Sequence, residues 1–303
     1  MLSMMVMSCQ EAPRPGAWSD ADMVVEPPTR EYLALVSVTL TDDPTGELES
    51  SGRGDAHVAS LGTFIEYAGG NEQHVRMLSG IPQRAAQRFS PGTCVRVDSL
   101  TRPFTSNDLV ATPTEVMLLD VGNIYLEANE QKLPFDLVLV PDLPPVFAGV
   151  SYRQRETSLS VGTPSPDGSF MGVVHIDALS DSDLNAIFEP VVFPPAIALS
   201  VELDEEQNTL HAQWEGASPD PMEFEIQFVD SDGGDLSVVC VIEDRSMLTL
   251  PLRDLEGLNL PSSLPVHVTA RRFTSSIRAS GVFEEIEFQG IRASQVSLDP
   301  SLP

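Results

Sequence analysis

The chain contains five histidines, the residue type that most often binds zinc or transfers protons near neutral pH. No two of them are four residues apart, and none lies near a cysteine, so the spacing of a zinc site is absent. We therefore expect no metal-ligating histidine, and most of the five fall within expected strands. They are His57, His74, His175, His211 and His267.

One acidic segment invites a calcium interpretation. Asp230–Asp235 reads Asp-Ser-Asp-Gly-Gly-Asp, with oxygen ligands at the first and third positions of a calcium-binding loop. The fifth position is Gly234 and the twelfth is Val241, so the bidentate acid of such a loop is missing. Because expected strands flank the segment, we interpret it as a hairpin turn, and a weak calcium site is the alternative.

Two other short patterns have simpler explanations. Asp177, Asp181 and Asp183 form a second acidic cluster, and the capped start of a short helix over Leu184–Phe188 explains it. The tripeptide Arg-Gly-Asp at residues 53–55 matches an integrin-binding motif but lies in a Gly- and Ser-rich stretch. We interpret it as a surface loop.

Signatures of catalysis are absent from the sequence. It has no Gly-x-Ser-x-Gly nucleophile elbow, no Cys/His signature and no glycine-rich phosphate-binding loop. Paired carboxylates could serve glycoside hydrolysis, but 45 acidic residues make accidental pairs unavoidable. We expect no catalytic residue and no cofactor, so the protein is expected not to be an enzyme. A carbohydrate-active or other hydrolase, with a site not visible in sequence, is the alternative.

Cys9 has the most informative neighbours of any residue in the chain. The uncharged and mostly apolar run Met1–Ser8 ends at this cysteine, and the polar, turn-forming run Gln10–Gly16 follows it. The pattern resembles the end of a bacterial lipoprotein signal. That resemblance implies that Cys9 is lipidated and becomes the mature N-terminus, with the protein anchored to the outer membrane or cell surface.

The leader departs from the lipoprotein pattern in three ways. Val6 and Met7 replace the residues usual at their positions, the apolar run is short, and no basic residue precedes Arg14. Two interpretations remain: the natural start lies upstream and supplies the basic half, or Met1–Met7 is an apolar tail.

Composition limits the partners. The formal net charge is −28, from 45 acidic and 17 basic residues. Such a field repels nucleic acid and anionic lipid headgroups, so we expect neither as a partner. No run of about 18 apolar residues exists, so no segment is expected to span a membrane. At 303 residues with 42% hydrophobic content, the chain suggests about two domains with cores of their own.

The two remaining cysteines lie in apolar, strand-like runs in different expected domains. Free cysteine packs as a small hydrophobic residue, so two buried thiols at Cys94 and Cys240 are the expectation. A disulfide between them in an oxidising compartment is the alternative.

From Glu31 onward, short β-branched and apolar runs alternate with turns rich in glycine and proline. This predicts an all-β protein of two β-sandwich-like domains with only short helical turns, one of them within 82–88. The expected strands are 32–40, 57–67, 94–100, 115–119, 123–128, 135–140, 146–152, 170–176, 196–203, 209–214, 224–228, 236–242, 247–250, 266–270 and 283–288.

Composition shifts divide the chain. Two proline clusters within Glu189–Pro195 cannot sit inside a regular element and mark a boundary, and residues 154–168 are polar and turn-rich. The predicted division is a leader and acidic tether over 1–29, a sandwich- or barrel-like domain over 30–180, a linker with a short helix over 181–195, a second sandwich over 196–296 and a tail over 297–303.

The second sandwich resembles the fibronectin type III or immunoglobulin-like fold, with seven short strands in about a hundred residues and an early tryptophan. The tyrosine expected before the sixth strand is missing, with Leu264-Pro265-Val266 in its place. The residues that resemble the second, third and fifth strands are Leu210 and Trp214, then Phe224, Ile226 and Phe228, then Leu250 and Leu255.

The whole layout resembles uncharacterised envelope lipoproteins of GC-rich bacteria, a family that implies no catalytic residues. We expect a non-catalytic binding or scaffolding module that uses sheet edges or loop ends to hold a protein or glycan partner. A structural spacer is a further alternative. Exposed aromatic residues clustered on one face would favour glycan binding, and two close carboxylates in a deep pocket would favour an enzyme.

Overall fold

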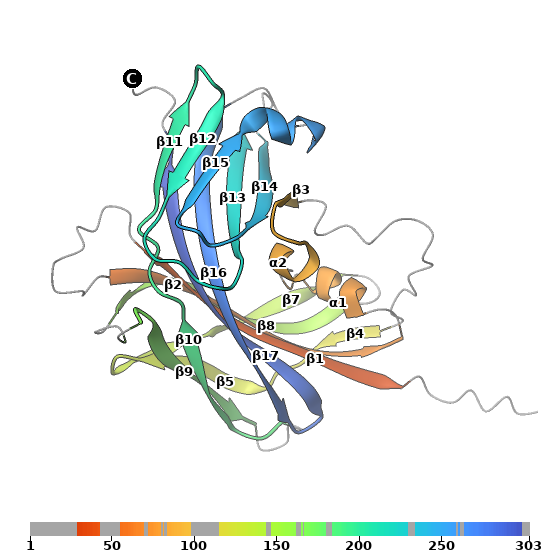
Figure 1. Ribbon diagram of the computed structural model, residues 1–303. Coiled ribbons are helices and arrows are strands. Elements are labelled where there is room, and N and C mark those ends of the chain that lie inside the picture. The colour runs from red at the N-terminus through yellow and green to blue at the C-terminus, as the bar shows by residue number, and fades with distance from the viewer. Residues whose placement is uncertain are drawn as a thin grey trace, which may run out of the picture.

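The computed structural model describes residues 29–42, 55–69, 72–79, 81, 84–97, 115–143, 147–161, 165, 167–179, 184–229, 234–258, 260 and 264–298. Strands form nearly all of its regular structure, which confirms the predicted all-β class (Figure 1). The helices among the described residues are α1 (Glu72–Leu78), α2 (Ala85–Arg88) and the 3-10 helix η1 (Leu252–Leu258).

The strands are β1 (Arg30–Asp42), β2 (Asp55–Ala68), β3 (Thr93–Arg96), β4 (Glu115–Leu118), β5 (Gly122–Ala128), β6 (Gln131–Pro134), β7 (Asp136–Leu143), β8 (Phe147–Ser160), β9 (Phe170–Ala178), β10 (Ile187–Phe193), β11 (Ser200–Asp204), β12 (Thr209–Gln213), β13 (Met222–Val229), β14 (Asp235–Ile242), β15 (Met247–Pro251), β16 (Pro265–Ser280) and β17 (Phe283–Ser297). Ten of them form one sheet in the order β3-β14-β13-β16-β17-β1-β2-β4-β8-β7. A four-stranded sheet has the order β10-β9-β5-β6, and a three-stranded sheet has the order β11-β12-β15.

Both small sheets pack on the same face of the large sheet. Phe288 of β17 belongs to the core under the four-stranded sheet, and Ala270 of β16 belongs to the core under the three-stranded sheet. Ala270 is paired with Ser294, and Ser294 projects to the same side as Phe288 because alternate residues of a strand share a face. Figure 1 shows the three-stranded sheet at the upper left and the four-stranded sheet below it.

The two α-helices cover the opposite face of the large sheet. Val75 of α1 packs with Leu33 and Leu35 of β1, which alternate with the core residues of that strand. Ala85 of α2 packs with Val239 and Val241 of β14 in the same way. The result is two adjacent sandwiches that share one long sheet.

The predicted division at residues 181–195 does not interrupt the large sheet. β17, from the predicted second domain, pairs in parallel with β1, and β3, from the predicted first domain, pairs with β14. The hairpin β16–β17 continues well beyond the expected 266–270 and 283–288 because it crosses both sandwiches. Each core therefore takes residues from both predicted domains.

The predicted short helix and linker are wrong over Ile187–Phe193. These residues form β10, paired with β9, and they include Pro190. β10 is an end strand of its sheet, and a proline is tolerated there because one side of the strand donates no ladder hydrogen bonds. Asp181 and Asp183 lie outside the described residues.

Three smaller expectations also need correction. Residues 154–160, expected as turns, continue β8, which pairs with β2 as far as Ser160. Leu255, expected in the fifth strand, lies in η1 after β15 ends. α1 was not expected, because seven residues are too few to show a clear helical period.

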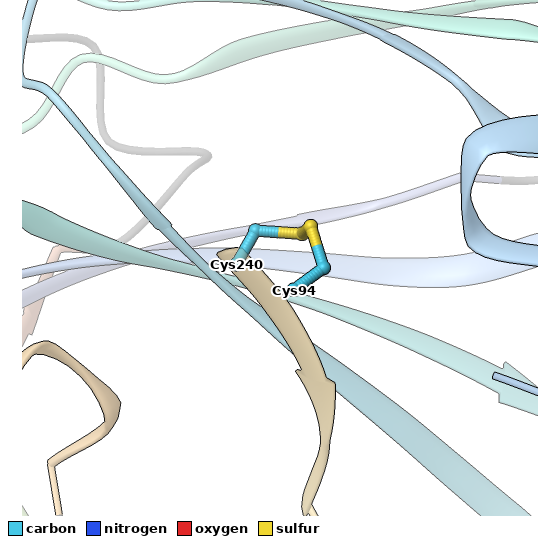
Figure 2. Close-up of a disulfide and its surroundings, with 2 residues drawn as sticks. All are labelled: Cys94 and Cys240. Carbon is cyan, nitrogen blue, oxygen red and sulfur yellow. A yellow bond between two sulfur atoms is a disulfide. The ribbon is translucent and has the colours of Figure 1, made fainter. Parts of the chain in front are cut away.

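The expectation of two free thiols is wrong, because Cys94 and Cys240 form a disulfide (Figure 2). The two residues are directly opposite each other on β3 and β14, with Cα atoms 4.0 Å apart, although 146 positions separate them in sequence. Local sequence does not reveal that these strands are neighbours, and their proximity makes the bond possible.

Several sequence predictions fall outside the described residues. These are the lipidation site Cys9, most of the acidic segment Asp230–Asp235, and the first two residues of the Arg-Gly-Asp tripeptide. Within the described part of the chain, no helix combines the length and apolar character needed to cross a membrane.

Candidate functional site

The outer face of the four-stranded sheet carries a mainly apolar surface on two of its strands. Alternate residues of β9 and β10 point into the first core, and those between them point outward. The outward residues face each other in three cross-strand pairs, which we call the outer strip: Met171 with Val192, Val173 with Pro190, and His175 with Phe188.

Three residues of the outer strip are unusually exposed for their type. Phe188 is 63% exposed, Met171 is 60% exposed and Val192 is 42% exposed. Isolated apolar residues on a surface are common, but a contiguous patch marks a binding surface in a soluble protein. The outer strip groups three such residues on two neighbouring strands, which makes it a candidate binding surface.

An aromatic row crosses the sheet at one end of the outer strip. Tyr125 of β5 is paired with His175, and their rings stack at 4.5 Å between centroids. The ring of Phe188 meets that of His175 edge-to-face at 5.0 Å, and the Lys132 ammonium lies 4.9 Å from the centre of the Tyr125 ring. Since Lys132 and His175 contact the Tyr125 ring, Phe188 presents the largest open ring surface of the row.

Polar groups border the aromatic row. His175 Nε2 is 3.2 Å from Glu127 Oε2, and Glu127 is 3.9 Å from the Lys132 ammonium. His175 Nδ1 is shielded from solvent and has no hydrogen-bond partner. Asn123 and Asp177 form the next cross-strand pair. The surface can therefore offer an open ring and methyl groups to an apolar ligand face, with hydrogen-bonding groups at its side.

The side of β10 that does not pair with β9 is covered by β16 and β17. The outer strip is therefore exposed through its side chains and not through an open strand edge. Thr274 of β16 donates a hydrogen bond to the Val192 carbonyl, and Glu189 of β10 pairs with Arg278. Gly290 of β17 lies against the same carbonyl, where an added Cβ would be 2.2 Å from the oxygen. A residue without a side chain is required at this crossing.

A cleft of about 390 Å³ lies between β1, α1 and the β16–β17 hairpin. Several of its polar and charged groups contact one another. The Tyr67 hydroxyl donates to Glu31 at 2.7 Å, and Arg76 contacts both Glu72 at 2.8 Å and Glu287 at 3.7 Å. Burial, with help from Glu31, raises the pKa of Tyr67. These contacts explain how α1 is held on the sheet. No group of three or more His, Cys, Asp or Glu residues among the described residues is arranged to hold a metal ion.

Glu223 is the carboxyl group whose pKa is clearly raised in the described part of the chain, and burial is the main cause. It accepts a hydrogen bond from the Ala86 backbone amide at 3.0 Å, so it fastens α2 to β13. It does not line the cleft beside α1.

The structure brings one of the five histidines, His175, into the candidate site. His57, His211 and His267 lie on β2, β12 and β16, and His74 lies on α1. Sequence reasoning missed Phe188 because its segment was expected to be helical. The alternation of Ile187–Phe193 was the available signal.

Comparison of the chain with protein-family models, with curated proteins and with solved structures gives no match. A fold does not determine a function, so the function has to be inferred from the chemistry of the surface itself.

Proposed function

We propose that this protein is a non-catalytic binding and scaffolding module of the bacterial cell envelope, anchored through a lipid on Cys9. The outer strip is its glycan-binding face. The observation that supports this proposal is the row Tyr125–His175–Phe188 on one exposed sheet face, next to the uncharged pairs of β9 and β10.

The chemistry of the face suits a sugar. One face of a pyranose ring carries mainly C–H groups, which pack on an aromatic ring, while its hydroxyls require hydrogen-bonding partners at the edge. Phe188 supplies the exposed ring, and Glu127 and Lys132 supply acceptor and donor at the border. Binding of a neutral glycan requires no positive charge on the protein. Binding of nucleic acid does require it, and the net charge of −28 opposes such binding.

The strand arrangement supports a fibronectin type III or immunoglobulin-like architecture for the second sandwich. The first, second and fifth strands (β11, β12 and β15) form one sheet, and the third, fourth, sixth and seventh (β13, β14, β16 and β17) lie in the other. Sandwiches of this architecture are common in cell-surface domains, which supports the proposed compartment. The Cys94–Cys240 disulfide also suits an oxidising compartment.

Glycan binding is tested with the full chain and purified cell-wall sacculi in a sedimentation assay. We expect the protein to sediment with the glycan, and we expect Phe188→Ala to weaken binding about tenfold. The matched control is Ile277→Ala, which removes a similarly exposed apolar side chain from β16. Binding unaffected by Phe188→Ala, or no binding at all, would refute the proposal. Release of soluble sugar fragments would favour the hydrolase alternative.

The anchor is tested by mass spectrometry of the protein from its native membranes. We expect an N-terminal peptide that begins at Cys9 and carries several acyl chains, because a single chain gives only weak membrane binding. An unmodified peptide from near Met1 in the soluble fraction would remove the anchor and the compartment from the proposal. It would leave the outer strip as a surface to be tested.

A further inference from the structure

β7 is the end strand of the ten-stranded sheet. It pairs with β8 on one side, and no strand among the described residues pairs with its other side (Figure 1). The backbone groups on that side are the kind of template on which another strand can form.

Three successive described side chains of β7 are apolar and exposed, and they alternate between the two faces of the sheet. Leu139 is 75% exposed, and its neighbours Leu137 and Val138 are 46% and 39% exposed. Proteins commonly protect an end strand with charged side chains, short length or proline. Over Leu137–Val140 this strand carries no charge, so an apolar edge is left open.

Leu137 and Leu139 lie on the core side of the sheet. They are directly opposite Tyr152 and Val150 of β8, which are buried in the first core. The strand that ends the facing sheet on this side, β6, has only four residues and leads through Phe135 into β7. Among the described residues, no strand flanks Leu137 and Leu139 on the outer side of β7, and one further strand would place side chains beside both leucines.

We propose that β7 accepts an extended segment of another protein by strand addition. This inference concerns a different surface from the outer strip and goes beyond the proposed glycan binding. The added strand pairs with Asp136–Val140, because Pro141 has no amide hydrogen and the pairing register shifts between Val140 and Leu143.

The geometry also determines the chemistry of the partner. Alternate residues of the added strand point toward Leu137 and Leu139, so those residues are apolar. The net charge of −28 and the exposed Asp136 at the start of β7 favour a basic segment and disfavour a second copy of this chain. The partner is thus a basic peptide with an alternating apolar pattern.

The test uses fluorescence anisotropy with the full chain and a labelled nine-residue peptide, in which valine and threonine alternate and a lysine stands at each end. Two control peptides carry a central proline or terminal glutamates. We expect saturable binding of the lysine peptide and at least roughly tenfold weaker binding of the proline peptide. We expect weaker binding of the glutamate peptide, with a difference that decreases in high salt.

Leu139→Lys places a charge on the free edge and is expected to weaken binding roughly tenfold. Met247→Lys is the control, because Met247 is 61% exposed on β15, an end strand of the three-stranded sheet. Circular dichroism verifies that both variants are folded. In the unmodified chain, amide exchange of β7 slows when the peptide binds.

Three results would overturn the inference: no binding of the lysine peptide, equal binding of the proline peptide, or binding that Leu139→Lys leaves unchanged. Sedimentation equilibrium of the chain alone could give a fourth contradicting result. A dimer that Leu139→Lys dissociates would mean that a second copy, not a basic partner, occupies β7.

Discussion

Arg272 and Arg292 stand directly opposite each other on β16 and β17, and both side chains are buried on the face that carries the two small sheets. Each arginine has its own carboxylate. Arg272 Nε donates to Asp244 at 2.7 Å, and Arg292 Nε donates to Asp42 at 3.0 Å. Two buried like charges are tolerated side by side because each is paired and hydrogen-bonded.

The same groups hold the segment that connects the two sandwiches. Arg272 also donates to the carbonyls of Pro195 and Ala196 at 3.4 Å, and the Ile197 amide donates to Asp42 at 3.4 Å. Residues 195–197 lie in the connection between β10 and β11. The arginine pair therefore fixes the passage of the chain from one core to the other.

Arg272→Met is expected to destabilise the protein by about 3–5 kcal/mol, because it leaves the Asp244 carboxylate buried without its counter-charge. Trp214 Nε1, which donates to Asp244 at 2.6 Å, cannot replace the lost charge. Urea unfolding measures the difference. The control is Arg245→Met, which removes the exposed Arg245–Glu243 pair and is expected to change stability by less than about 1 kcal/mol. Similar losses in both variants would contradict the role of burial.

The Cys94–Cys240 disulfide is expected to stabilise the folded chain by about 2–4 kcal/mol, because it closes a long loop in the unfolded state. A reducing agent should lower the urea midpoint of the wild-type protein. It should have no such effect on a double variant with Cys94→Ala and Cys240→Ala. Thiol titration under denaturing conditions should count two additional thiols after reduction. An unchanged thiol count would show that the bond is absent.

Tyr152→Phe is expected to cost about 1–3 kcal/mol, because the buried hydroxyl is a junction of hydrogen bonds. It donates to Asp120 at 2.6 Å and accepts from the Val121 amide at 2.8 Å. Thermal or urea unfolding near neutral pH measures the loss. A variant as stable as the wild type would mean that these bonds contribute little.

The same tyrosine makes stability depend on alkaline pH. Burial, and then the bond to Asp120, raises the pKa of Tyr152 above its ordinary value of 10.0. As pH rises above that value, the unfolded chain loses the phenol proton and the folded chain retains it, so the stabilisation is complete below pH 10 and decreases above it. Urea unfolding at several alkaline pH values should show this decrease. The slope should be smaller in Tyr152→Phe, and equal slopes would exclude this group as a cause.

Gly290→Ala is expected to destabilise the protein by about 1–3 kcal/mol through overpacking. The new methyl group would meet the Val192 carbonyl and the Thr274 hydroxyl where β10 crosses β17. Gly257→Ala is the matched control, since a Cβ there has nothing within 4 Å. Calorimetric unfolding of the two variants compares them. Equal midpoints would contradict the close approach of the two strands.

The sequence by itself determined the all-β class and the position of most strands. Alternation is a local property, and in Phe170–Ala178 it separates the inward residues from the outward ones, because side chains along a strand alternate between its faces. Glycine and proline likewise mark turns through their own backbone limits. These signals need no knowledge of distant residues.

Only the tertiary structure decided which strands are neighbours. Cys94 meets Cys240, Arg272 meets Arg292, and His175 meets Phe188 through strand pairing, and β10 is a strand because β9 and the β16–β17 hairpin hold it. Backbone hydrogen bonds between strands can join any two extended segments, so local sequence leaves the partner open. Burial of both small sheets against one long sheet selects among those partners. That selection created the outer strip, and it left one side of β7 without a paired strand in the part of the chain that the structure describes.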